Sequence, residues 1–381
     1  MKVFKAHSLT GRITMSLMKK AFKAVRKNRG CAGIDRVSIQ MYERNLEQNL
    51  TALMKRLKDR SYLPYPLLRH NLDEGKGKIR PLGIPAVRDR VAQEVVRRLI
   101  EPYFEPYFSD WSYGFRPNRN CHQAIRRMLE LKKQGYRILL DADIKGFFNN
   151  IPHELIIDLV AEKIADGNIL KLIRKFLKSG VMEDGVLKKT IKGTPQGGVI
   201  SPLLANIVLD VLDKELAAKG YVFVRYADDF LVLVKSTSEI EKAYDLVRSV
   251  VEGKLQLQLS PEKTKITSFN EGFDFLGFHF TSRSVVIRTK SVEKLKEKIK
   301  GLTIRKHNFS DNVIQKINRA TRGFANYFDT EFSSVKDVFY KLDCFTRRRL
   351  RCMKKKRISN MDNFRIPNKY FDKRGLIPLY S

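Results

Sequence analysis

The chain has 381 residues, of which 43% are hydrophobic and 30% are charged. It is long enough for two or three folded domains and too apolar to be a disordered tail. Lysine and arginine together number 74 against 41 acidic residues, which gives a formal net charge of +33. This excess predicts a polyanionic partner, above all nucleic acid, because basic side chains displace the counterions condensed on phosphates.

Features that the sequence lacks exclude several classes of protein. There is no run of about 18 apolar residues, no signal-peptide pattern and no lipidation motif, so we expect no membrane partner. The four cysteines include no Cys-x-x-Cys pair, and the six histidines form no i, i+4 pair. These spacings predict neither a zinc site nor a disulfide framework, and we expect reduced thiols in a cytoplasmic protein.

The first half of the chain is predicted to alternate helices with short strands. Apolar residues recur at helical spacing in 13–28 and 41–59, and a glycine- and lysine-rich turn after them lies between two short strands. A helix follows the second of these strands. The next predicted elements are a strand at 136–144 and helices at 152–163 and 199–218.

Two adjacent acids interrupt the apolar segment 223–234, FVRYADDFLVLV, which otherwise predicts two strands. Burying even one unpaired carboxylate costs several kcal/mol. We therefore expect a tight hairpin connection that carries both Asp228 and Asp229 and lets their side chains project from the tip. The preceding strand supplies Asp141 and Asp143, which lie two positions apart and so share a face.

Asp143, Asp228 and Asp229 predict a metal centre. Three carboxylates from separate elements can hold two Mg²⁺ ions, because Mg²⁺ prefers oxygen ligands. Paired ions can stabilise both the attacking and the leaving oxygen of an in-line phosphoryl transfer. The alternative interpretation is a pair of surface hairpin acids and a capping aspartate.

The C-terminal part of the chain changes in composition. A helix at 238–253 and strand-like segments at 263–269 and 273–280 come first. From about residue 290 basic helices predominate, and they would line one wall of a duplex channel. Their charge would recognise the backbone and shape of the duplex more than its sequence. The run at 347–357 could equally be a solvated charge run. The aromatic residues at helical spacing are expected in the core; they are Phe324, Tyr327 and Phe328.

Five blocks of the sequence resemble, in order, the reverse transcriptase blocks of group II intron-encoded proteins and their bacterial relatives. They are GKIRPLGIPAVRDR, SYGFRPNRNCHQAI, DADIKGFF, GTPQGGVISPLLANIVLD and YADDF. The blocks span about 70 to 280, and the helical flanks resemble the N-terminal extension and thumb of that family. The resemblance implies an α+β right-hand polymerase with fingers, a palm whose antiparallel sheet packs on helices, and an α-helical thumb.

The resemblance also implies a division into domains. We expect an N-terminal helical extension with the start of the fingers at 1–68, fingers and palm at 69–285, a basic maturase-like thumb at 286–360 and a C-terminal tail at 361–381. The expected protein is compact, because the DNA-binding and Cys/His endonuclease regions of many relatives have no counterpart here. Asn149 departs from the family, which commonly has Asp at that position.

By resemblance, the metal ligands are Asp143, Asp228 and Asp229, with the backbone carbonyl of Ile144 close to the metal. The expected cofactor is a pair of Mg²⁺ ions, with Mn²⁺ able to substitute. Lys263 matches the position that is proposed in the family to protonate the departing pyrophosphate, although other lysines and glutamates surround it.

The expected nucleotide-binding residues come from three blocks. Lys78 and Arg80 would clamp the triphosphate, Lys as a point charge and Arg as a fork; for Lys78 the alternative is a surface base. Phe148 matches the aromatic residue that blocks a 2′-hydroxyl and so selects deoxynucleotides, whereas the alternative is a core phenylalanine, the role expected of Phe147. Gln196 would lie beside the nascent base pair, unless its segment is only the turn before a helix.

Template and primer contacts are expected from two further residues and one hairpin. Gly197 permits close approach because glycine has no side chain. Arg116 either faces the cleft or buttresses it. Residues Phe275, Leu276 and Gly277 belong to a hairpin that resembles the primer grip, which would hold the primer 3′ end in line with the metals.

The resemblance implies an RNA-directed DNA polymerase of group II intron type in the bacterial cytosol. Its partners would be a template RNA, a DNA or RNA primer, and deoxynucleotides; the oligomeric state is not predicted. One alternative is a domesticated enzyme that copies a dedicated noncoding RNA in anti-phage defence. A second is a splicing maturase that binds RNA and whose polymerase activity is incidental.

Overall fold

The computed structural model describes residues 5–73, 79–195, 197–359 and 361–380. The chain divides into two compact units, Met1–Ile266 and Thr267–Ser381, which are described separately. This division precedes the boundary predicted between residues 285 and 286, since the short strands after Thr267 cluster with the C-terminal helices. The domain boundaries predicted from the sequence stay a prediction.

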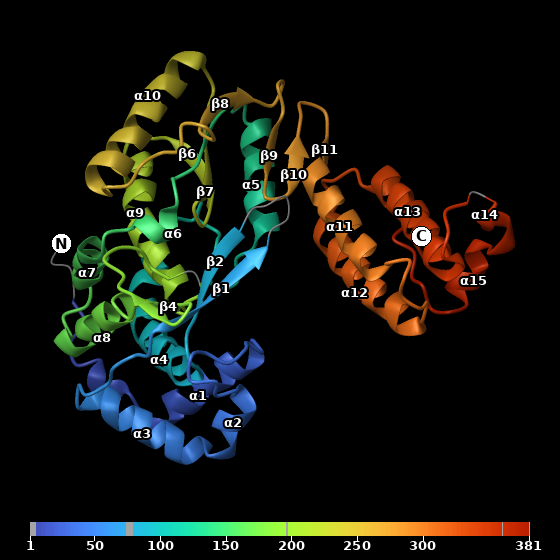
Figure 1. Cartoon of the computed structure of the whole chain (residues 1–381). Helices are drawn as coiled ribbons and strands as arrows, with labels where there is room; N and C mark the ends of the chain where they lie inside the picture. Colours follow the sequence, from blue (N-terminus) through green and yellow to red (C-terminus); the bar gives the residue numbers. More distant parts are fainter. Residues whose placement is uncertain (1–4, 74–78, 196, 360, 381) are drawn as a thin grey trace. The chain divides into compact units, whose positions relative to one another are not determined.

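Helices at the start of the first unit pack around one central helix (Figure 1). They are α1 (Met15–Lys27), α2 (Ile39–Arg44), α3 (Leu46–Lys58) and the central α4 (Val87–Phe104). Thr14 caps α1 by accepting a hydrogen bond from the Leu17 N–H, and the helix buries one apolar stripe. The predicted helix 41–59 is divided at Asn45, where the backbone leaves the helical region.

A four-stranded sheet follows these helices in the order β2-β1-β4-β5. Its strands are β1 (Leu67–Asp73), β2 (Ile79–Ile84), β4 (Val181–Glu183) and β5 (Val186–Lys188). The pair β1–β2 is antiparallel, as expected for two strands joined by a turn, whereas β4 adds to β1 in parallel. This is the sheet expected of the fingers.

A second four-stranded sheet has the order β6-β7-β3-β8. Its strands are β3 (Ile138–Ala142), β6 (Val222–Tyr226), β7 (Asp229–Val234) and β8 (Lys265–Ser268). Strand β7 is antiparallel to both β3 and β6. Helices α5 (Cys121–Lys133), α9 (Ser201–Ala218) and α10 (Thr237–Arg248) pack against these strands. Buried residues of β3, β6, β7 and α9 belong to the main hydrophobic core, and the result is the antiparallel palm sheet on helices that was predicted.

Shorter elements connect these layers. They are α6 (Phe147–Asn150), α7 (His153–Ala161), α8 (Gly167–Leu177), the 3₁₀ turns Thr10–Arg12 and Glu105–Tyr107, and the π-helical turn Ser249–Lys254. The predicted helix 238–253 is therefore α10 followed by this π-helical turn.

The second unit contains a small sheet and a set of helices. Strands β9 (Phe273–Phe275), β10 (Phe278–Phe280) and β11 (Val285–Ile287) form an antiparallel sheet of order β11-β10-β9. The helices are α11 (Thr289–Leu302), α12 (Asp311–Phe328), α13 (Lys336–Lys355), α14 (Asp362–Arg365) and α15 (Asn368–Asp372). Phe328 is buried and packs on the rings of Phe324 and Tyr327, so these aromatics serve the core as predicted.

Within the described ranges, no helix is both long and apolar enough to cross a membrane.

Candidate active site

The acidic hairpin is tighter than the sequence suggested. Tyr226 pairs with Asp229, so the connection between β6 and β7 consists of only Ala227 and Asp228. Ala227 adopts the left-handed conformation, with φ of 60°. The prediction that the connection carries both acids is therefore wrong for Asp229, which is the first residue of β7, because a two-residue turn closes the hairpin before it.

The register of the neighbouring strand brings the third acid to the same edge of the sheet. Ala142, the last residue of β3, pairs with Phe230. In an antiparallel pair the next residues in register are Asp143 and Asp229, so these two acids lie level with each other at the strand ends. Asp143 is half-buried.

Electrostatic interactions connect four of the predicted site residues: Asp143, Asp228, Arg80 and Lys263. Burial raises the pKa of Asp228 above its ordinary value, and the negative charge of Asp143 raises it further. Arg80, on strand β2, and Lys263 act in the opposite direction. The fold thus gathers two acids and two bases from four separate segments.

Lys263 forms the closest of these contacts. Its Nζ donates to Oδ2 of Asp143 at 2.9 Å. The surrounding loop is fixed to the same residue, because the Ser260 N–H donates to the Asp143 carbonyl at 2.7 Å and the Asp143 N–H donates to Thr264 Oγ1 at 3.4 Å. This position is compatible with the predicted role of Lys263 beside the reacting phosphates.

The donor set at this edge fits a divalent cation in part. Asp143 and Asp228 raise each other's energy when both are ionised, and a cation between them would relieve that repulsion. In the described part of the chain, however, no three His, Cys, Asp or Glu side chains are close enough together to hold a metal ion.

Ile144 is buried beside these acids and forms an isolated β-bridge with Leu259. The bridge uses the Asp143 carbonyl, which accepts from the Ser260 N–H, and the Lys145 N–H, which donates to the Gln258 carbonyl. The Ile144 carbonyl, predicted to lie close to the metal, is not part of this bridge.

Phe147 and Phe148 both belong to the main hydrophobic core, and Phe148 also borders a small cavity. The cavity measures about 230 Å³, and its lining includes Phe148, Gly83, Thr194 and Pro195. The rings of the two phenylalanines meet edge to face at 5.3 Å, with Phe147 2% exposed and Phe148 9%. The predicted role of Phe148 in sugar selection stays a prediction.

In this structure the backbone of the glycine-rich segment lies close to another part of the protein, the backbone of β2. A side chain on Gly197, whose φ is +114°, would meet the carbonyl oxygen of Gly83 at 2.5 Å. Strand β2 and this segment are therefore in direct backbone contact. Gln196 and Lys78 lie outside the described residues, so their predicted roles stay predictions.

Arg116 is buried and contacts residues close to it in the sequence. Its guanidinium is buried and donates to Glu105 Oε1 at 2.9 Å and to the carbonyls of Ser109 and Ser112. Burial lowers the pKa of this guanidinium. These contacts favour the buttressing alternative.

The sequence reasoning missed a buried network behind the acidic hairpin. Arg225 on β6 is fully buried and forms a salt bridge with Asp213 of α9. The same guanidinium donates to Asn206 Oδ1 at 2.9 Å and to the Ala227 carbonyl at 3.1 Å. Asn206 in turn donates to the carbonyl of Gly114 at 2.9 Å. The network holds the backbone of the turn that carries Asp228.

The predicted primer-grip hairpin lies in the second unit. Its turn is formed by Leu276 and Gly277, which both have positive φ, after Phe275 at the end of β9. Tyr327 Oη donates to the Leu276 carbonyl at 2.8 Å. Helix α12 therefore holds the turn.

Comparison with family models decides the class of this protein. Residues 70–280, more than half of the chain, match the model for reverse transcriptase (RNA-dependent DNA polymerase). The chain belongs to the reverse transcriptase family. Residues 292–371 match the group II intron, maturase-specific domain. These matches confirm the prediction of a group II intron-type reverse transcriptase. They also confirm the right-hand polymerase fold and the activity of an RNA-directed DNA polymerase.

The chain is also similar to individual proteins and to a solved structure. Protein YkfC of Escherichia coli (strain K12) is 35% identical over 283 residues, covering 64% of this chain and 74% of YkfC. The group II intron-encoded protein LtrA of Lactococcus lactis is 33% identical over 323 residues, covering 68% of this chain and 53% of LtrA. The chain thus spans about half the length of LtrA. A solved structure of telomerase from Candida albicans with a fragment of telomeric RNA aligns with 88% of this chain and 67% of that chain, with a TM-score of 0.47 and 14% identity.

Proposed function

We propose that this reverse transcriptase copies a structured RNA into DNA at the edge formed by Asp143, Asp228 and Asp229. The observation that carries the proposal is the convergence of Asp143, Asp228, Arg80 and Lys263 from four segments at one end of the palm sheet. A pure RNA-binding protein has no use for closely spaced acids, which repel nucleic acid and one another.

The acids are proposed to hold a pair of Mg²⁺ ions, or Mn²⁺ in their place, with the Ile144 carbonyl nearby. When bound, such ions stabilise the attacking 3′-oxygen and the leaving oxygen during an in-line phosphoryl transfer. The contribution of the chain itself is to aim the carboxylates, and the two-residue turn at Ala227 and Asp228 fixes where one of them points.

The remaining residues are proposed to orient the substrates. Arg80, together with Lys78, neutralises the triphosphate. Phe148 excludes a 2′-hydroxyl at its cavity. Gln196 and Gly197 lie beside the nascent base pair. Lys263 releases Asp143 and donates a proton to the departing pyrophosphate. The hairpin of Phe275, Leu276 and Gly277 positions the primer end.

We further propose that the template is intron RNA, and that binding to it assists splicing. The maturase-specific match at residues 292–371 and the net charge of +33 support this RNA-binding role. The primer, DNA or RNA, and the bacterial cytosolic location remain predictions.

The test is to purify the protein from its native host, sequence the RNA bound to it, and extend a primer on that RNA with Mg²⁺ and deoxynucleotides. Intron RNA that is copied supports the proposal. A single discrete RNA without intron sequence would replace the intron by a dedicated noncoding template, and no synthesis on any RNA would overturn the proposed polymerase role.

A further inference from the structure

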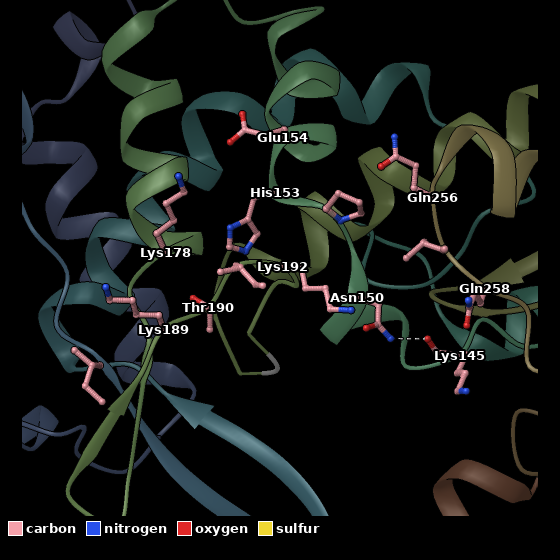
Figure 2. Close-up of a pocket in the computed structure, with 14 residues that line it drawn as sticks. Lys145, Asn150, His153, Glu154, Lys178, Lys189, Thr190, Lys192, Gln256 and Gln258 are labelled. Carbon is pink, nitrogen blue, oxygen red and sulfur yellow. Dashed lines mark hydrogen bonds between the residues drawn. The ribbon is translucent and has the colours of Figure 1, made fainter.

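A groove in the first unit lies outside the set of residues assigned to catalysis. It has a volume of about 1180 Å³ and is drawn in Figure 2. Its basic side chains come from the loop before α6, from the residue after α8 and from the segment after β5. They are Lys145, Lys178, Lys189 and Lys192. All four are exposed.

The positive charge of this groove is not neutralised by the protein. In the described part of the chain, no salt bridge involves any of these four ammonium groups, although several other exposed lysines have acidic partners. The acidic side chain in the lining is Glu154, which is paired with Arg174 at 2.7 Å. Four unpaired cations around one hollow favour an occupant with several negative charges.

The groove also offers amide groups of the kind that contact ribose and bases. Gln256 and Gln258 line it, are exposed and have no side-chain hydrogen bond within the described ranges. Figure 2 shows them with Lys145 at one side of the groove, while Lys178 and Lys189 lie at the other. Asn150, between the two sides, donates through Nδ2 to the Lys145 carbonyl at 2.9 Å.

Hydrogen bonds hold the segment from Lys192 to Thr194 and connect the lining of the groove to the candidate site. Pro152 and Lys192 form an isolated bridge, and His153 donates through Nε2 to the Gly193 carbonyl at 2.8 Å. The next residue, Thr194, donates its N–H to the Phe148 carbonyl at 2.7 Å. The groove is therefore built on the same segment that lines the cavity beside Phe148.

The groove and that cavity border the same segment, because Thr190 and Lys192 line both. An occupant of the groove would therefore lie next to the segment that lines the cavity beside Phe148. A continuous, flexible polyanion fits the groove better than a rigid duplex, which is too wide to enter a hollow of this volume.

We propose that the groove binds a single-stranded RNA segment, with lysines on its phosphates and the amides of Gln256 and Gln258 on ribose or base edges. The proposal rests on the proposed copying of RNA and adds a binding surface to it. Recognition is independent of sequence, since charge on the backbone supplies most of the interaction.

The test compares two double variants that remove equal charge from exposed positions of the first unit. Lys189→Gln with Lys192→Gln changes the groove, and Lys219→Gln with Lys242→Gln changes residues that do not line it. The probe is a labelled oligouridylate of about 20 nucleotides, long enough to pass beyond one site. Binding is measured without deoxynucleotides, so the result is readable even if no polymerase activity is found.

The groove variant is expected to raise the Kd about tenfold near 0.1 M salt and to lower the slope of log Kd against log salt by about 1.4, at about 0.7 per phosphate contact. The control variant is expected to change the Kd less than about twofold, as is Lys189→Arg with Lys192→Arg, which keeps both charges. Equal losses in the groove and control variants would overturn the proposal. So would an unchanged Kd of the groove variant for the oligouridylate.

Discussion

The guanidinium of Arg225 donates a hydrogen bond to the carbonyl oxygen of Ala227 at 3.1 Å, inside the turn that carries Asp228. The same side chain is clamped by Asp213 at 2.5 Å and is fully buried. A buried arginine in this arrangement does more than balance one charge. Its guanidinium fixes the backbone of the turn and so sets the orientation of the Asp228 carboxylate.

Arg225→Lys is therefore expected to slow primer extension about 10- to 100-fold with little change in KM, because a small displacement of a catalytic group is costly. Stability should fall by about 1–3 kcal/mol, since several buried hydrogen bonds are lost. Arg119→Lys is the control, because Arg119 pairs with the exposed Asp110. Rate and stability are measured on both variants.

A double variant separates positioning from stability. Arg225→Met with Asp213→Leu removes both buried charges and is expected to regain most of the lost stability, as apolar replacements of buried ion pairs often do. The extension rate should stay low. A double variant that is stable and as fast as wild type would show that Arg225 does not position the turn.

Replacing Phe148 by alanine is expected to reduce discrimination against ribonucleotides about 10- to 100-fold, because the cavity beside it would accept a 2′-hydroxyl. Single-nucleotide incorporation of paired deoxy- and ribonucleotides measures the ratio. Phe147→Leu is the control: it changes a core ring and should cost about 1.5 kcal/mol or less without relaxing sugar selection. Unchanged discrimination in the Phe148 variant would assign that ring to the core alone.

Asp228 is expected to oppose folding when no cation is bound. Its raised pKa means that the folded chain binds a proton more readily than the unfolded chain, so stability falls as pH rises through that pKa and is regained on acidification. Asp228→Asn should therefore raise the Tm at neutral pH in a chelator and shrink the gain in Tm that Mg²⁺ gives the wild type. A lower Tm for Asp228→Asn in chelator would contradict this account.

Lys263 is expected to act as more than a charge. Lys263→Gln should lower kcat about 10²-fold or more if it supplies a proton, and Lys263→Arg should not restore the rate, because arginine does not give up its proton. Lys265→Gln, beside Asp141 at 4.0 Å, is the matched control. Full rescue by arginine would reduce the role of Lys263 to electrostatics.

The strands of the palm could be predicted from the sequence because the pattern that marks them lies within each short segment. Alternation of apolar residues marks β3, β6 and β7, and Asp143 and Asp228 stand where those strands end. The turn was harder: Ala227 adopts a left-handed conformation that glycine or asparagine usually signals, so Asp229 was expected in the connection instead of at the start of β7.

Contacts between distant segments could not be predicted in this way. Arg225 stands out only as a charged residue inside an apolar strand, and its partner Asp213 lies on α9 without any spacing that connects the two. Lys145 and Gln258 likewise meet at one side of the groove through a backbone contact between segments far apart in sequence. Such pairs depend on tertiary packing, which periodicity does not encode.

The most direct test of the central claim is primer extension on an RNA template with Mg²⁺ and deoxynucleotides, comparing wild type with the Asp228→Ala, Asp229→Ala variant. Both proteins are first checked for equal folding and equal affinity for the template. We predict cDNA from the wild type and a loss of about 10³-fold or more in the variant, because ions held by these acids would stabilise the attacking and leaving oxygens. Equal synthesis by both proteins would contradict the assignment of the active site to this hairpin.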